Sequence, residues 1–139
     1  CRGWSIFQFE KGYRFNHDDI LLAYFASQDR AAQCLLDLGS GIGSVGLLWL
    51  AQQPPSARLA LLEAQADSVA LCRRTLQTCG LEKRATLALG DLRDEDALRQ
   101  LGGGFDLVTA NPPYTPPVDR LLPKHPQRRF CNYELRGGW

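Results

Sequence analysis

The sequence has no apolar run that approaches the ~20 residues of a membrane-spanning helix, so no membrane association is expected. Its five cysteines are odd in number and form no C-x-x-C pair, which argues against a metal site and against a disulfide framework. Reduced thiols of this kind are typical of a cytoplasmic protein. The sequence also lacks methionine and begins at Cys1, and we therefore expect a piece of a longer protein.

A strong net charge is also missing, because the formal charge at pH 7 is only +1. The charged residues are, however, unevenly distributed along the sequence. Residues 118–139 hold five Lys and Arg against two acidic residues, whereas residues 1–117 hold eleven against thirteen. A basic tail suits a polyanionic partner. On charge alone, a solvated surface is the simpler interpretation.

Strand and helix patterns alternate along the chain. Short apolar runs predict strands over 34–38, 59–62, 85–89 and 105–110, with helices over 20–26, 67–78 and 94–101 and one more that ends at 53. This alternation predicts an α/β fold with right-handed βαβ units and a doubly wound, mostly parallel sheet. Aromatic residues that alternate around Gly12 predict an N-terminal hairpin. We expect residues 1–30, the hairpin and first helix, to pack on the ligand site of a partial α/β domain over 31–139.

The last predicted strand ends in the turn Asn111-Pro112-Pro113-Tyr114. Prolines cannot donate to a sheet, so the strand must stop there, at the edge where open α/β sheets bind ligands. The Asn111 side-chain oxygen and the Pro112 carbonyl can accept both N–H bonds of a flat amine, while Tyr114 stacks on its face. Asn-Pro is also a common surface turn, but its place after a buried strand favours a functional site.

Each of the first three predicted strands has a carboxylate in its last two residues or just after its end. Asp37 precedes the glycine turn at 39–43, where glycines let the backbone approach a ligand closely. Glu63 can accept hydrogen bonds from both hydroxyls of a ribose, and Asp91 can accept one from an adenine amine. Asp37 disfavours a pyrophosphate and favours an ammonium or sulfonium group. The three acids outline an adenosine with a positively charged tail.

The glycine turn alone leaves an alternative open. Residues 41–46 satisfy the pattern G-x-G-x-x-G, and Glu63 lies near the spacing that dinucleotide-binding folds use. A nicotinamide dinucleotide-binding module is therefore a second hypothesis.

Taken together, the motifs resemble those of class I S-adenosylmethionine-dependent methyltransferases. The resemblance is carried by Asp-Leu-Gly-Ser-Gly-Ile-Gly at 37–43, Glu63, Gly-Asp at 90–91 and Asn-Pro-Pro-Tyr at 111–114. The Asn-Pro-Pro-Tyr form is the variant that methylates planar amino groups: adenine N6, cytosine N4 or a glutamine amide. Residues 12–23 and 125–135 are similar to segments of the bacterial family that methylates adenine N6 in valine tRNA.

The resemblance implies an enzyme that uses S-adenosylmethionine to methylate adenine N6 in RNA, with tRNA as the first candidate. N5-methylation of a protein glutamine by the same loop is the alternative. The implied cofactor-binding residues are Asp18, Asp37, Gly39, Gly41, Gly43, Glu63, Asp91 and Leu92, and the implied catalytic residues are Asn111, Pro112 and Tyr114. Arg128 and Arg129 are candidates for contacts with RNA phosphates, or else for a solvated helix face.

The first helix carries two adjacent acids, Asp18 and Asp19. From the residues alone, Asn16 to Asp19 supply an N-cap and first-turn acids. The family resemblance has a small residue at position 19, so Asp19 departs from it. The family fold also has seven strands where four are found here, and we therefore expect a chain that is cut at its C-terminus.

Overall fold

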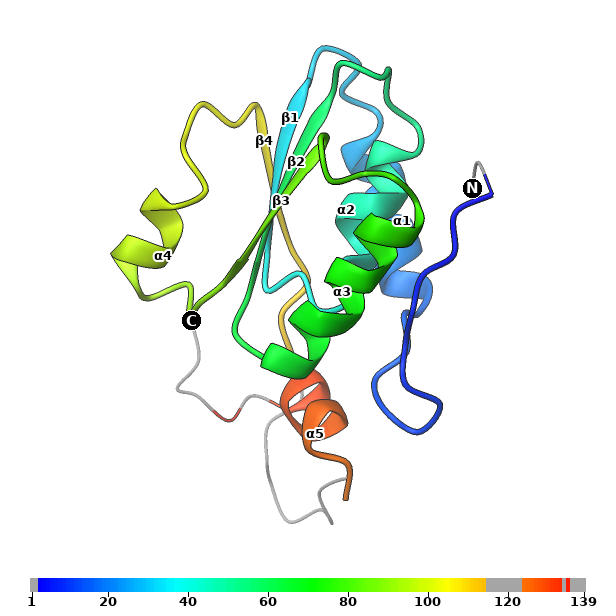
Figure 1. The fold of residues 1–139 in the computed structure, drawn as a ribbon, viewed down its shortest axis with the longest axis vertical. Helices are drawn as coiled ribbons and strands as arrows, with labels where there is room; N and C mark the ends of the chain where they lie inside the picture. The colour runs from blue at the N-terminus through cyan, green and yellow to red at the C-terminus, as the bar shows by residue number, and fades with distance from the viewer. Residues whose placement is uncertain (1–2, 115–123, 134, 136–139) are drawn as a thin grey trace.

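Four parallel strands form one sheet in the order β3-β2-β1-β4 (Figure 1). The computed structural model describes residues 3–114, 124–133 and 135. Its strands are β1 (Cys34–Leu38), β2 (Arg58–Glu63), β3 (Ala85–Leu89) and β4 (Leu107–Ala110), and each neighbouring pair is parallel. The predicted α/β fold with a parallel sheet of four strands is confirmed.

Alternating apolar side chains give the sheet a core on each face. Leu35, Leu59 and Leu61 belong to one buried cluster, whereas their neighbours Leu36 and Leu62 belong to a second cluster on the other face. Because side chains of a strand alternate in direction, a strand that is covered on both faces must be apolar at nearly every position. This requirement explains why the central strands β1 and β2 were visible as continuous apolar runs, whereas β3 and β4 each bury a single residue.

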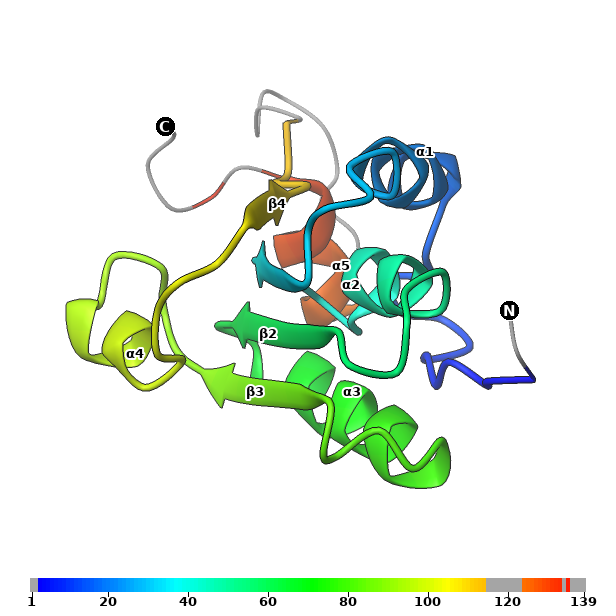
Figure 2. The ribbon, with the colours of Figure 1, turned by 90° about the horizontal axis from the view of Figure 1, so that it is seen from above.

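Helices cover both faces of the sheet (Figure 2). One face carries α1 (His17–Ala26), α2 (Ser44–Leu50) and α3 (Ala66–Thr78), and the other face carries α4 (Glu95–Arg99). The chain therefore changes face between β3 and β4, and strand order reverses between β1 and β4. Such a reversal opens a crevice at the carboxyl ends of the strands. Within the described residues, no helix is long and apolar enough to cross a membrane.

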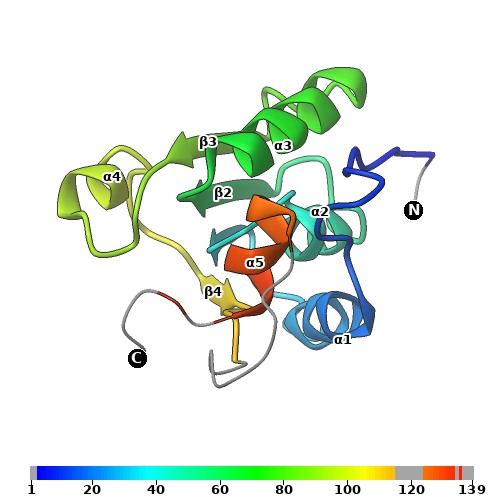
Figure 3. The same cartoon turned by 90° about the horizontal axis from the view of Figure 1, so that it is seen from below.

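A fifth helix, α5 (Pro126–Asn132), lies at this carboxyl edge of the sheet (Figure 3). It follows the stretch 115–123, which falls outside the described residues, as do the side chain of Arg128 and residues 136–139. Helix α5 is thus placed next to the crevice that the strand order creates.

Helix α1 begins three residues earlier than predicted, at His17, because Asn16 caps it. The Asn16 side-chain oxygen accepts hydrogen bonds from the backbone N–H groups of Asp18 (2.8 Å) and Asp19 (3.3 Å). Asp19 Oδ2 in turn accepts from the Asn16 backbone N–H at 3.1 Å, which completes a capping box. The predicted capping role of this segment is confirmed.

The predicted N-terminal hairpin is wrong, because residues 3–16 contain no strand in the structure. The segment runs along α3 instead. The Phe7 backbone N–H donates to Thr75 Oγ1 at 3.0 Å, and the Arg74 guanidinium lies 4.2 Å from the centroid of the Phe7 ring. The aromatic residues of this segment therefore reflect packing against helices rather than pairing of strands.

Gln127 of α5 joins the N-terminal segment to α3. Its Oε1 accepts from the Tyr13 backbone N–H at 3.0 Å, and its Nε2 donates to Ser68 Oγ at 2.9 Å. Gln127 is only 1% exposed, and a Cβ on Gly12 would overlap with its Oε1. Gly12 is thus required for a close approach to α5 and not for a hairpin turn.

Candidate functional site

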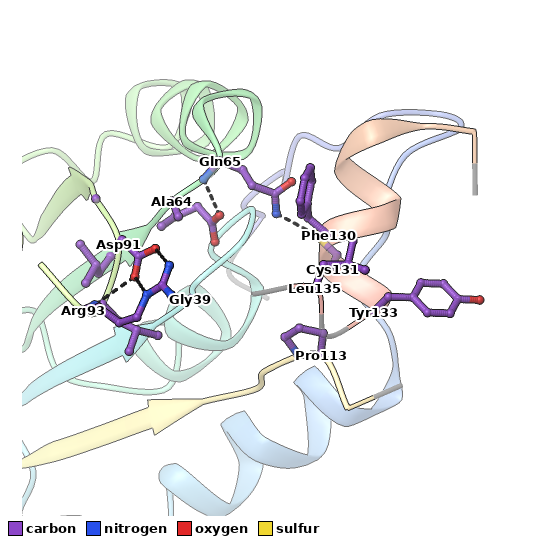
Figure 4. Close-up of a pocket in the computed structure, with 14 residues that line it drawn as sticks. Gly39, Ala64, Gln65, Asp91, Arg93, Pro113, Phe130, Cys131, Tyr133 and Leu135 are labelled. Atoms are coloured by element: carbon purple, nitrogen blue, oxygen red, sulfur yellow. Dashed lines mark hydrogen bonds and ion pairs between the residues drawn. The ribbon is translucent and has the colours of Figure 1, made fainter. Parts of the chain in front are cut away.

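Two neighbouring cavities lie at the carboxyl edge of the sheet. The larger cavity, about 220 Å³, lies between the ends of β2 and β3 and helix α5 (Figure 4). The smaller cavity, about 40 Å³, lies between the glycine turn, α1 and the end of β4. Gly39 and Cys131 line both, so the two cavities are adjacent.

Glu63 is buried in the wall of the larger cavity. Its Oε2 accepts from the Gly41 backbone N–H at 2.8 Å and its Oε1 from the Gln65 backbone N–H at 2.7 Å. A carboxylate accepts hydrogen bonds on both oxygens, so these two bonds fix its orientation in the cavity wall. The geometry suits a vicinal diol such as that of a ribose.

Asp91 lines the same cavity and is held by Arg93 (Figure 4). Arg93 Nε donates to Asp91 Oδ1 at 2.9 Å, and an Arg93 terminal nitrogen lies 2.7 Å from Asp91 Oδ2. Leu92 is partly exposed beside them and also lines the cavity. An adenine amine that bonds Asp91 must therefore share the carboxylate with Arg93.

The glycine turn shapes the space between the two cavities. Gly39 and Gly41 have φ of 64° and 57°, which L side chains rarely adopt, and nothing lies within 4 Å of the position that a Cβ would occupy on either. Between them, Ser40 Oγ is buried and has no hydrogen-bond partner within the described part of the chain. An open backbone beside a buried hydroxyl without a partner fits a polar ligand, such as the charged tail of S-adenosylmethionine.

Asp37 is 1% exposed and lines the smaller cavity. Its Oδ1 accepts from Thr109 Oγ1 at 2.8 Å, and its Oδ2 accepts from the Gly46 backbone N–H at 3.1 Å. Burial raises the pKa of Asp37 to about 7; the two hydrogen bonds oppose this shift, and the nearby negative charges of Asp19 and Glu63 add to it. A cation in this cavity would favour the charged form of Asp37.

Asn111 follows β4 directly and lines the smaller cavity together with the glycine turn. Its side chain is partly buried, and its Nδ2 donates to Asp19 Oδ1 at 2.8 Å. Pro113 lines the larger cavity, so the proline turn touches both spaces. The amide predicted to bind a planar amine therefore lies next to the turn predicted to hold the charged tail.

Tyr114 and Asp18 meet outside the two cavities. Tyr114 is 75% exposed, and its hydroxyl donates to Asp18 Oδ2 at 3.2 Å. This hydrogen bond, followed by the charge of Asp18, raises the pKa of Tyr114. The contact ties the proline turn to the first turn of α1, while contacts of Asp18 with a cofactor and of Tyr114 with a base stay predictions.

Outside the glycine turn and the start of α2, three residues of the smaller cavity were missed by the sequence reasoning: Tyr13, Asp19 and Cys131. Burial, with the negative charge of Asp19 as the next cause, raises the pKa of Tyr13, and burial raises that of Cys131 to about 11. Asp19 had been assigned to helix capping alone. No spacing rule connects these positions, because they come from the N-terminal segment, α1 and α5.

The remaining predicted site residues take other places. Gly43 is the N-cap of α2 and Pro112 is partly buried, and neither is among the residues that line the two cavities. Arg129 is exposed on α5, and the side chain of Arg128 lies outside the described residues. Within the described part of the chain, no group of three or more His, Cys, Asp and Glu is placed to hold a metal ion.

The fold and the position of the cavities define a Rossmann-like α/β protein with a ligand site at the switch in strand order. The chain belongs to the Methyltransferase small domain family, whose model matches residues 17–121. This match confirms the predicted class I methyltransferase fold and supports the predicted cofactor, S-adenosylmethionine. It disfavours the alternative of a nicotinamide dinucleotide-binding module.

Relatives with two different names match the chain at similar identity. The tRNA1(Val) (adenine(37)-N6)-methyltransferase of Porphyromonas gingivalis is 30% identical over 122 residues, which are 81% of this chain and 48% of that protein. The release factor glutamine methyltransferase of Chlorobaculum tepidum is 30% identical over 96 residues, which are 69% of this chain and 32% of that protein. The chain thus spans about half or less of the length of these relatives.

A solved structure supports the fold. Cofactor-bound Rv0187 from MTB matches with a TM-score of 0.57 and 26% identity, over 70% of this chain and 44% of that one.

Proposed function

We propose that the protein transfers a methyl group from S-adenosylmethionine to a planar amine, and that adenine N6 in RNA, first of all in tRNA, is the target. The observation that carries the proposal is the position of Asn111, whose amide lines the same small cavity as Asp37 and the glycine turn. Because its Nδ2 donates to Asp19, its carbonyl oxygen points away from that carboxylate and can accept from a target amine.

The two cavities suit the two parts of the cofactor. In the larger cavity, Glu63 would hold the ribose hydroxyls, and Asp91 and Leu92 would contact the adenine. In the smaller cavity, Asp37, Ser40 and the backbone at Gly39 and Gly41 would hold the charged tail. When it is bound, S-adenosylmethionine supplies a methyl group activated on a sulfonium sulfur.

Asn111 and the Pro112 carbonyl would accept the two N–H bonds of the amine and align its nitrogen with the methyl carbon. The bound cofactor would supply the methyl carbon to this nitrogen, and its sulfur would keep the electron pair of the carbon–sulfur bond. The amine proton then passes to water. Positioning of this kind can lower the barrier by up to roughly 7–11 kcal/mol. Tyr114, exposed at the end of the turn, would stack on the flat group.

Two observations favour RNA as the substrate. The relative named as a tRNA methyltransferase aligns with 81% of the chain, and basic residues predominate in 118–139. The second candidate is a protein glutamine, whose side-chain amide also presents a planar NH₂ group. It is supported by the relatives named as release factor glutamine methyltransferases.

Incorporation of labelled methyl groups tests the proposal. The full-length protein is incubated with S-adenosylmethionine labelled in its methyl group and with either total RNA or total protein. We expect label in the RNA; label in protein only would support the glutamine candidate instead. Calorimetry with S-adenosylhomocysteine and with NAD is the companion measurement, and tight binding of NAD alone would contradict both candidates.

A further inference from the structure

The carboxylate of Asp19 is a meeting point of three elements. Asp19 is 3% exposed, and its Oδ2 accepts from the backbone N–H of Asn16 at 3.1 Å and from Ser44 Oγ at 3.1 Å. Its Oδ1 accepts from Asn111 Nδ2 at 2.8 Å. One buried side chain of α1 therefore contacts the N-terminus of α2 and the residue that follows β4.

The contact with Asn111 decides which way that amide faces. A carboxylate only accepts hydrogen bonds, whereas an amide carries a donor end and an acceptor end that have nearly the same shape. Asn111 must therefore turn its NH₂ group toward Asp19. Its carbonyl oxygen then points away from the carboxylate.

We propose that Asp19 is a positioning residue for methyl transfer, which holds the Asn111 amide with its oxygen toward the target amine. The inference rests on the proposed function, because it concerns the same amide. It does not depend on whether the amine belongs to adenine or to glutamine, since both present N–H groups to one acceptor.

The charge of a carboxylate adds a second effect to orientation. A negative group that accepts from the NH₂ end of an amide polarises it and increases the electron density on its oxygen. The target nitrogen gains positive charge as its bond to carbon forms, so a more negative Asn111 oxygen stabilises that state better than the ground state. Asn16 and Ser44 hold the carboxylate itself in place.

The first test is Asp19→Asn in the full-length protein, assayed with total RNA, or with total protein if label enters that pool. The variant keeps the size of the side chain but allows it to present NH₂ to the NH₂ of Asn111. We expect kcat to fall on the order of 10- to 100-fold. The Kd of S-adenosylhomocysteine and the KM of the substrate should change by less than about 3-fold, because both oxygens of Asp19 are already bonded to protein donors although the residue lines the smaller cavity.

The second test exchanges the two side chains. Asn111→Asp alone places two carboxylates against each other, whereas Asn111→Asp together with Asp19→Asn restores one donor and one acceptor. The carboxylate at position 111 still accepts from an amine. We therefore expect the double variant to have a higher kcat than either single variant, an increase that a purely structural role of Asp19 does not produce.

Asp94→Ala is the matched control, because it weakens the N-cap of α4 on the other face of the sheet (Figure 2) and leaves the Asp19–Asn111 contact in place. It should lower the Tm but change kcat by less than about 3-fold. Equal kcat for Asp19→Asn and the unmodified protein would overturn the inference, as would joint loss of kcat and cofactor binding without rescue by the exchange. If the unmodified protein labels neither RNA nor protein, the proposed function fails instead.

Discussion

The two cavities are built from different kinds of contact, although they share Gly39 and Cys131. In the larger one, Glu63 is oriented by backbone N–H groups close to it in the fold, and Asp91 by Arg93 two residues away. In the smaller one, Asp19 and Asn111 are 92 residues apart and orient each other.

The difference suggests that the two cavities have different roles in binding and in methyl transfer. Acceptors fixed by backbone N–H groups or by a side chain two residues away suit a rigid ligand that binds in one way, as the adenosine of the cofactor does. Side chains that meet across three elements can be placed in line with a reacting atom, which no single turn provides. We therefore expect changes in the larger cavity to affect cofactor affinity, and changes at the Asp19–Asn111 contact of the smaller cavity to affect the rate.

The largest effect is expected for Asn111→Ala in the smaller cavity. Without the amide, the target amine loses an acceptor at the point where charge develops, so kcat should fall roughly 100- to 1,000-fold. The Kd of S-adenosylhomocysteine should stay within about 3-fold of the original, measured by calorimetry. Loss of methyl transfer and of cofactor binding together would contradict the role given to this residue.

Glu63→Ala should give the opposite pattern in the larger cavity. Hydrogen bonds to a charged acceptor contribute about 1.5–3 kcal/mol, so the Kd of S-adenosylhomocysteine should rise roughly 10- to 100-fold. At saturating cofactor, kcat should change much less. Glu82→Ala, an exposed glutamate far from this edge, is the control and should leave the Kd unchanged. A variant of Glu63 that binds normally would refute the assignment.

The pKa of Asp37, raised to about 7 by burial, predicts a pH dependence of cofactor binding. The charged form predominates above this pKa, and a sulfonium cation binds the charged form better. Affinity for S-adenosylmethionine relative to S-adenosylhomocysteine, which lacks the sulfonium charge, should therefore rise with pH, by up to about tenfold between about pH 6 and pH 8. Asp37→Asn should remove the rise, and a ratio that is flat in the unmodified protein would exclude a sulfonium group beside Asp37.

The smallest effect is expected for Gln127→Ala, which tests how α5 is held beside both cavities. The change leaves the Tyr13 backbone N–H and Ser68 Oγ without this partner, so the free energy of unfolding should fall by about 1–3 kcal/mol. The measurement is urea denaturation. Gln52→Ala, on an exposed glutamine at the end of α2, should stay within ~0.5 kcal/mol. Equal losses for the two would mean that Gln127 does not fasten α5.

The central strands β1 and β2 could be predicted because burial on both faces leaves a direct trace in the sequence. The bounds of β1 and β3 agree with the prediction, and helix α3 differs by one residue at its start. The glycine turn, Glu63 and Asp91 could be placed at one edge for the same reason, since parallel strands end together.

The rest depended on contacts that no local pattern encodes. The aromatic residues of the N-terminal segment alternate as in a hairpin, yet Phe7 packs beneath Arg74 of α3. Asp19 satisfies the capping box that its spacing predicts, and its second oxygen reaches Asn111 only because α1 packs against the end of β4. Capping was visible in four consecutive residues, whereas the second role required the folded sheet.

The identity of the methylated atom tests the central claim most directly. Substrate labelled by the full-length protein is digested, and mass spectrometry determines which atom carries the new methyl group. A methyl group on an exocyclic amine of a base, N6 of adenine first of all, or on the amide nitrogen of glutamine is the result that a planar-amine site at Asn111 predicts. A methyl group on a hydroxyl oxygen or on carbon would contradict it.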